Sequence, residues 1–309
     1  MQHFTSLEEL HLNETWGTIG AFDGVHRGHQ ALIQQLVSSA HNEQKPAVVV
    51  TFYPHPVVVL RKIATPFYLT SSEERAALLG ELGVDYVVTL PFSFELSILS
   101  AHQFMQMLVE HLGLRKLFTG HDFALGHNRE GNVERLRNIG EELGYEIEVV
   151  PPLDFGGEVV SSSRIRTLIS KGEVQQAARL LGRLYSLSGQ VVHGDGRGHG
   201  LGVPTSNLEV QPQRILPANG VYACWAIVND QRIPAVTNVG LRPTFEDQPL
   251  QPRVETHLLD FQGQLYGQMI KLQFISRIRP EKRFSAVDEL LDQIRKDIQI
   301  AREVLANAE

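Results

Sequence analysis

Two histidines near the N-terminus lie in a pattern that could bind a phosphate. His26 and His29 flank Gly28, between a run typical of a strand and a run typical of a helix. Free N–H groups at a helix start attract anions, and imidazoles placed there can donate to phosphate oxygens as charge develops. Gly28 would let a phosphate approach the backbone. A histidine pair alone would be two ordinary solvated residues, but the strand before it, with Gly20 and Gly24, makes an anion site the stronger interpretation.

Three serines and an arginine offer a second set of phosphate donors. Ser161, Ser162 and Ser163 open a helical pattern, and Arg166 follows about one turn later. Serines at a helix start can cap it and donate to phosphate, and an arginine can form a fork onto phosphate oxygens. Taken alone, the serines are better explained as helix caps. Together with the histidines they indicate a nucleotide site.

A glycine-dense stretch covers residues 189–202. It lacks the Gly-Lys-Ser/Thr string of a phosphate-binding loop, and no helical pattern follows it. A flexible turn is therefore its plain interpretation.

These residues need a scaffold, and the first part of the chain predicts an α/β fold. The predicted strands cover residues 17–21, 47–52, 86–90, 116–119 and 146–150, with apolar residues at helical spacing between them. The alternation predicts a doubly wound parallel sheet. Ligands of such sheets bind at the carboxyl ends of the strands, which is where the histidine segment lies.

The second part of the chain has a different pattern. Predicted strands at residues 187–193, 221–228, 233–239, 254–259 and 268–274 suggest a small antiparallel barrel or sandwich. Residues 285–288 resemble a capping box, and a C-terminal amphipathic helix follows that we expect to pack on the strands. Gly182 ends the preceding helical pattern, so we predict two domains, residues 1–182 and 183–309.

Composition excludes several classes of protein. The 309 residues are 42% hydrophobic and 20% charged, which is ordinary for globular domains, and no apolar run approaches the ~20 residues that cross a bilayer. The net charge of −7 comes from the first domain, and neither domain has a basic run for nucleic acid. The single cysteine, Cys224, lies in a strand pattern and is expected to be an inert core thiol. We expect a cytoplasmic protein without membrane or nucleic-acid partners; weak homo-oligomer formation is left open.

The histidine segment, Gly-x-Phe-Asp-Gly-Val-His-x-Gly-His, resembles the nucleotidylyltransferase superfamily and, within it, the adenylylating half of bifunctional bacterial riboflavin kinase/FMN adenylyltransferases (FAD synthetases). Residues 50–56, 120–126 and 160–166 resemble further segments of that family. The resemblance implies a Rossmann-like domain in which His26, His29 and Arg166 are catalytic. It implies transfer of an adenylyl group from ATP to the FMN phosphate, with Mg²⁺ on the triphosphate. The ligand-binding residues it implies are Gly20, Phe22, Asp23, Gly24, Gly28, Asp122, Ser161, Ser162 and Ser163.

The second domain resembles riboflavin kinases through Pro-Thr-Ser-Asn at residues 204–207 and through segments up to residue 284. This implies a β-barrel with a C-terminal helix that transfers the γ-phosphoryl group of ATP to riboflavin. Glu255 is the implied general base, and Thr205 and Asn207 are implied oxygen ligands of Mg²⁺ and ATP. Gly194, Gly196, Gly198 and Arg279 are implied ligand-binding residues.

Two other functions share some of these features. A class I aminoacyl-tRNA synthetase also has a His-x-Gly-His motif, but this chain lacks a Lys-Met-Ser-Lys-Ser-like string and a basic face for tRNA. A flavin-binding carrier without catalysis is the second alternative. The presence of Glu255, His29 and Arg166 with their motif neighbours favours an enzyme that makes FAD.

Overall fold

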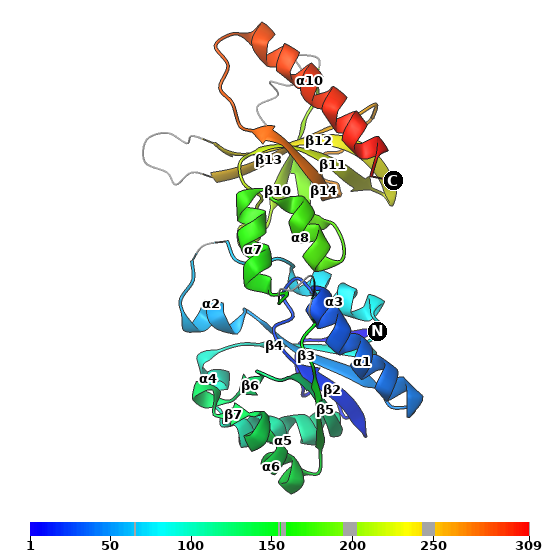
Figure 1. Ribbon diagram of the computed structural model, residues 1–309, viewed down its shortest axis with the longest axis vertical. Coiled ribbons are helices and arrows are strands. Elements are labelled where there is room, and N and C mark those ends of the chain that lie inside the picture. Colours follow the sequence, from blue (N-terminus) through cyan, green and yellow to red (C-terminus); the bar gives the residue numbers. More distant parts are fainter. Residues whose placement is uncertain (65, 154, 156–158, 194–202, 243–250, 309) are drawn as a thin grey trace. The chain divides into compact units, whose positions relative to one another are not determined.

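The computed structural model describes residues 1–64, 66–153, 155, 159–193, 203–242 and 251–308 (Figure 1). The chain divides into two compact units, Met1–Ser162 and Ser163–Glu309. The domain boundary predicted at 182/183 lies C-terminal to this division and stays a prediction. Each unit is described by itself below.

A six-stranded, wholly parallel sheet forms the centre of the first unit. Its strand order is β1-β4-β3-β2-β5-β8. The strands are β1 (Gln2–Phe4), β2 (Thr15–Ile19), β3 (Ala47–Tyr53), β4 (Tyr86–Pro91), β5 (Leu114–Gly120) and β8 (Glu146–Val150). The five predicted strands and their parallel arrangement are confirmed. β1 was not predicted, because three residues at an edge carry too little pattern.

Helices cover both faces of this sheet, as doubly wound folds require (Figure 1). One core contains Ile33 and Leu79, from α1 (Arg27–Asn42) and α3 (Ser72–Glu81). The other contains Leu108 and Ile139, from α5 (Ala101–Leu112) and α6 (Val133–Leu143). Shorter elements are α2 (Pro56–Leu60), α4 (Phe94–Ser97), the 3₁₀ turn His127–Arg129, and the β6 (Ala124–Leu125) and β7 (Gly131–Asn132) pair.

The strand order reverses direction next to β2. From β2 the chain adds β3 and β4 on one side, and it then crosses to place β5 on the other side of β2. In open parallel sheets, ligands bind at such a reversal, outside the carboxyl ends of the strands. The loops after β2 and β5, which contain His26 and Asp122, both leave the sheet at this edge.

A closed antiparallel barrel forms the second unit, with strand order β10-β13-β12-β11-β14-β9. The strands are β9 (Tyr185–Val192), β10 (Ser206–Val210), β11 (Gly220–Val228), β12 (Gln231–Arg242), β13 (Gln251–Leu258) and β14 (Met269–Pro280). The choice between barrel and sandwich is thus resolved. β10 was not predicted, because its sequence, Ser-Asn-Leu-Glu-Val, is short and polar.

Helices pack on the outside of the barrel. α10 (Val287–Ala306) lies along β11, β12 and β14 (Figure 1), and it buries Ala301 and Leu305 near its C-terminal end. α8 (Val174–Leu181) contacts β9 and β14, and the Ala218 N–H donates to the Ile169 carbonyl of α7 (Ser162–Lys171) at 3.2 Å. The packed C-terminal helix is confirmed.

The expected capping box at the start of α10 is wrong. Ala286 is the N-cap and has no side-chain acceptor. Ser285 lies one position too early to cap, and its hydroxyl donates to Glu289 at 3.0 Å instead.

Cys224 behaves as predicted. The thiol is fully buried in β11, and burial raises its pKa to about 12, so it stays protonated at neutral pH.

Candidate active sites

The histidine motif caps the helix that follows β2. His26 is the N-cap of α1, where its Nδ1 accepts a hydrogen bond from the His29 N–H at 3.3 Å. A neutral ring that accepts at Nδ1 carries its proton on Nε2, so that nitrogen can donate to an anion. The two rings stack with their centroids 3.5 Å apart. The predicted pair is therefore assembled by the helix start itself.

Two glycines allow this turn to form. Gly24 has φ +83, a left-handed conformation that side chains rarely adopt. A Cβ on Gly28 would lie 3.3 Å from the His26 ring, which is tighter than most real contacts. Phe22 is buried, and its ring meets that of His29 edge-on at 5.1 Å.

Asp23 binds the chain rather than facing solvent. Its carboxylate is 1% exposed and accepts hydrogen bonds from the Leu69 N–H and the Thr70 N–H, each at 3.1 Å. The Asp23 carbonyl accepts from the Ser162 hydroxyl at 2.9 Å. Asp23 therefore joins the β2 loop to residues 69–70 and to Ser162, and these contacts indicate a positioning role.

The structure places the other implied residues of the adenylylation site on several segments. Gly20 directly follows β2, and Ser161 is half-buried next to Ser162. Asp122 is exposed after β5, and its carbonyl accepts from Arg129 at 3.1 Å. Ser163 and Arg166 belong to α7 within the second unit.

Arg75 is a buried cation next to the motif that no local sequence pattern predicts. Its Nη1 donates to the Ala21 carbonyl, to Thr51 Oγ1 at 3.2 Å and to the Phe52 carbonyl at 3.2 Å. It therefore joins the carboxyl ends of β2 and β3. Burial lowers the pKa of Arg75, and the Asp23 carboxylate opposes that shift. The only local signal was an ordinary helix start, the Ser71–Glu74 capping box.

We expect Arg75→Met to lower kcat/KM for FMN adenylylation at least tenfold, because Arg75 holds the Ala21 carbonyl at the start of the histidine loop, and a displacement of about 1 Å in positioned groups can cost about 10²-fold. Riboflavin phosphorylation should stay within twofold, which tests that the protein is folded. Assays of both reactions on one preparation measure this. Arg137→Met, on the exposed face of α6, is the matched control. Unchanged adenylylation in Arg75→Met would contradict the positioning role.

On the barrel, strand register brings the implied kinase residues into one row. Glu255 on β13 lies directly opposite Asn207 on β10 and Asn238 on β12. Directly paired residues point to the same face of a sheet. Their neighbours Val254 and Thr256 are buried, and Thr256 Oγ1 contacts Thr237 Oγ1 at 3.0 Å inside the barrel. Glu255 and the two asparagines therefore lie on the outer face.

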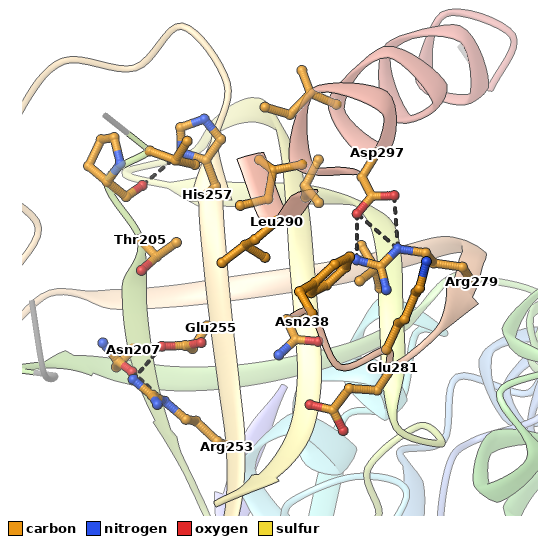
Figure 2. A pocket seen from close by; sticks show the side chains of 18 of the residues that line it. Thr205, Asn207, Asn238, Arg253, Glu255, His257, Arg279, Glu281, Leu290 and Asp297 are labelled. Atoms are coloured by element: carbon orange, nitrogen blue, oxygen red, sulfur yellow. Dashed lines mark hydrogen bonds and ion pairs between the residues drawn. The ribbon is translucent and has the colours of Figure 1, made fainter. Parts of the chain in front are cut away.

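This face borders a cavity of about 440 Å³ between the barrel and α10 (Figure 2). Its polar wall contains Thr205, Asn207, Asn238 and Glu255. Its apolar wall includes Val221, Phe284, Leu290, Ile294 and Ile298. The first half of the apolar stripe of α10 therefore lines a cavity, whereas its second half packs on the barrel.

Arg279 joins α10 to this wall. Its Nε and Nη2 donate to the Asp297 carboxylate at 2.8–3.0 Å, and its Nη1 donates to the Pro280 carbonyl at 3.0 Å. Asp297 is 2% exposed and also accepts from Gln293. Figure 2 shows this paired fork at the edge of the cavity. Arg279 lines the cavity, and its guanidinium is engaged with Asp297 of α10; the ligand-binding role implied for it stays a prediction.

The oxygen atoms along this row suit a hard divalent cation. Thr205 supplies a hydroxyl, Asn207 an amide oxygen and Glu255 a carboxylate. Mg²⁺ binds through few protein oxygens together with substrate phosphates. No group of three or more His, Cys, Asp or Glu side chains with metal-ligand spacing occurs among the described residues. The donor set therefore fits a cation that is shared with a nucleotide better than one held by the protein alone.

Some of the residues that line this cavity were predicted from the sequence. Glu255, Thr205 and Asn207 were expected, whereas Asn238 and Arg253 were not. Gly194, Gly196 and Gly198 lie outside the described residues. Asn238 had no local signal, because its place beside Glu255 depends on the pairing of β12 with β13.

Comparisons with known proteins match both units. A family model described as FAD synthetase matches residues 9–164, and one described as riboflavin kinase matches residues 181–305. A protein from Escherichia coli (strain K12), named bifunctional riboflavin kinase/FMN adenylyltransferase, is 38% identical and covers 93% of this chain and 91% of its own. A protein of the same name from Bacillus subtilis (strain 168) is 36% identical and covers 94% and 92%.

One solved structure has the same fold over almost the full length. It is described as a macrolide-efflux protein from Streptococcus pneumoniae, with TM-score 0.88, 30% identity, and coverage of 97% of this chain and 98% of its own. In the part of the chain that the structure describes, we find no helix with the length and apolar character needed to span a bilayer.

Proposed function

This chain belongs to the bifunctional riboflavin kinase/FMN adenylyltransferase family, and from that premise we propose which of its residues carry each reaction. The protein is an enzyme of FAD biosynthesis. It phosphorylates riboflavin with ATP to give FMN, and it transfers the adenylyl group of a second ATP to FMN to give FAD and pyrophosphate.

We propose that the outer face of the barrel carries the kinase reaction, with Glu255 as the general base. The observation that carries this proposal is the row Asn207–Glu255–Asn238 beside a cavity with one apolar wall. The ring system of riboflavin suits the apolar wall, and its ribityl hydroxyl needs a proton acceptor as it attacks the γ-phosphate. A carboxylate on this row can accept that proton.

Thr205 and Asn207 would hold Mg²⁺ together with the ATP phosphates. When bound, the cation would neutralise charge on the transferred phosphoryl group. The Thr205 side chain is exposed at the cavity wall, and the preceding Pro204 carbonyl contacts His257 Nδ1 at 2.7 Å, which connects this segment to β13. The amide loop implied for the phosphates, with Gly194, Gly196 and Gly198, stays a prediction, as does ligand binding by Arg279.

Adenylyl transfer is proposed at the start of α1. The attacking FMN phosphate is already an anion, so this step needs positioning and charge stabilisation rather than a base. His26 can donate from Nε2, and His29 stacks beside it at the helix N-terminus. Gly20, Phe22, Gly24 and Gly28 would shape the turn around the phosphates. Asp122, Ser161, Ser163 and catalysis by Arg166 remain implied by the family resemblance.

Incubation of the purified protein with riboflavin, ATP and Mg²⁺ tests the assignment of both reactions to this chain. We expect FMN to appear first and FAD to follow, with one pyrophosphate released per FAD. Chromatography of the flavins and a pyrophosphate assay measure this. Binding of flavin without turnover would support a carrier instead. A cytoplasmic location, the lack of nucleic-acid and membrane partners, weak self-association and the 182/183 boundary stay predictions.

A further inference from the structure

Arg253 contacts both the proposed base and a proposed magnesium ligand of the kinase site. Its Nη2 forms an ion pair with Glu255 Oε1, and its Nε donates to Asn207 Oδ1 at 3.1 Å. Figure 2 shows the guanidinium below Asn207 and Glu255, at the polar end of the cavity. The two charged side chains are 27% and 22% exposed, so water screens them only in part.

Strand geometry produces this arrangement. Arg253 and Glu255 are two residues apart on β13 and so point to the same face. Asn207 lies opposite Glu255 on the neighbouring strand, two positions along the ladder from Arg253 and therefore diagonal to it. A diagonal neighbour at this spacing is within reach of a long side chain. The strand register that assembles the proposed site therefore also places the positively charged Arg253 side chain in it.

The two oxygens that Arg253 contacts are of the kind that Mg²⁺ prefers. The Arg253 guanidinium carries a positive charge, and its N–H groups donate to lone pairs of the same two oxygens that a metal cation would use. A divalent cation that approaches Asn207 Oδ1 meets an oxygen that already accepts a hydrogen bond from the Arg253 Nε–H, and the guanidinium charge repels it. Arg253 and the metal therefore compete for the electron density of the same oxygens.

We propose that Arg253 is a positioning residue that competes with the divalent cation at Asn207 and Glu255, so that the kinase site takes up its metal only with the nucleotide. This inference rests on the proposed function of those two residues. The guanidinium orients both side chains before the cation arrives, and it limits binding of free metal. ATP would bring the metal cation together with its own phosphates, and the negative charge of those phosphates outweighs the positive charge of the Arg253 guanidinium.

Binding of Mn²⁺ alone to the full-length protein tests this, with free Mn²⁺ followed by electron paramagnetic resonance in the absence of nucleotide. We expect Arg253→Gln to bind Mn²⁺ roughly fivefold more tightly than the wild type, since one neighbouring like charge is removed. Arg253→Lys, which keeps the charge, should show a smaller gain. Arg232→Gln is the matched control: it removes an exposed cation that lies over Trp225 on the same barrel, outside the cavity lining.

A second substitution locates the effect. Asn207→Leu, added to Arg253→Gln, should abolish the gain in Mn²⁺ affinity. A gain that persists in this double variant would overturn both the proposal and the assignment of Asn207 as a ligand. Unchanged or weaker Mn²⁺ binding in a folded Arg253→Gln protein would overturn the proposal alone, provided that Glu255→Gln still abolishes kinase activity. An ion pair that served only stability would lower the melting temperature without raising metal affinity.

Discussion

Glu255→Gln should lower riboflavin phosphorylation by about 10²–10⁴-fold, the usual contribution of a general base, while FMN adenylylation stays within twofold of the wild type. The amide keeps the shape of the side chain but is not an effective base. It can still accept a hydrogen bond from Arg253, which pairs with Glu255. The loss should therefore appear mainly in kcat, with a small change in the KM for riboflavin. Separate assays with riboflavin and with FMN as the starting flavin measure the two reactions.

Glu209→Gln is the matched control for this experiment. Glu209 lies on β10, is exposed, and does not line the cavity, so both activities should be unchanged. Equal loss of both activities in Glu255→Gln would show that the residue supports the fold. Full kinase activity would exclude Glu255 as the base and would leave the row on the barrel without its proposed role.

His29→Ala should slow FMN adenylylation by roughly 10²-fold or more, as removal of one preorganised donor to a developing charge does elsewhere. The substitution also removes the ring that stacks on His26 at 3.5 Å. It leaves the His29 N–H, which bonds to His26 Nδ1, so the cap of α1 should persist. Initial rates of FAD and pyrophosphate formation from FMN and ATP measure the effect.

His41→Ala, at the other end of the same helix, is the control. That imidazole contacts Asp85 at 2.9 Å on the surface, far along α1 from the motif, and its loss should change adenylylation less than twofold. Riboflavin phosphorylation should be unaffected in both variants. A His29→Ala enzyme with full adenylyl transfer would count directly against the proposed site.

Much of the architecture could be predicted from residue order, because its signals are local. A run such as Ala47–Tyr53 is apolar on both faces, and it must therefore be a central strand of a covered sheet. Helical spacing identified α1, α3, α5 and α6 for the same reason. Glycines at the motif turn marked the β2 loop, since Gly24 adopts a conformation open to few other residues. The two-domain plan and the chemistry of the histidine motif follow from such short-range patterns.

The partners of the functional groups required the folded chain. Asn238 lies beside Glu255 only through the register of β12 with β13, and Arg253 reaches Asn207 only through the register of β10 with β13. Hydrogen-bonded register is a long-range property. The ligand-binding role expected of Asp23 stays a prediction; what the folded chain adds is that its buried carboxylate accepts from backbone N–H groups 46 and 47 residues away. Arg75 gave no sign of burial in its own segment, because its acceptors are carbonyls and a hydroxyl on β3 and the β2 loop. Local sequence specifies the spacing of apolar residues and the positions of turns. The surroundings of a charged side chain are set by segments that meet only after folding.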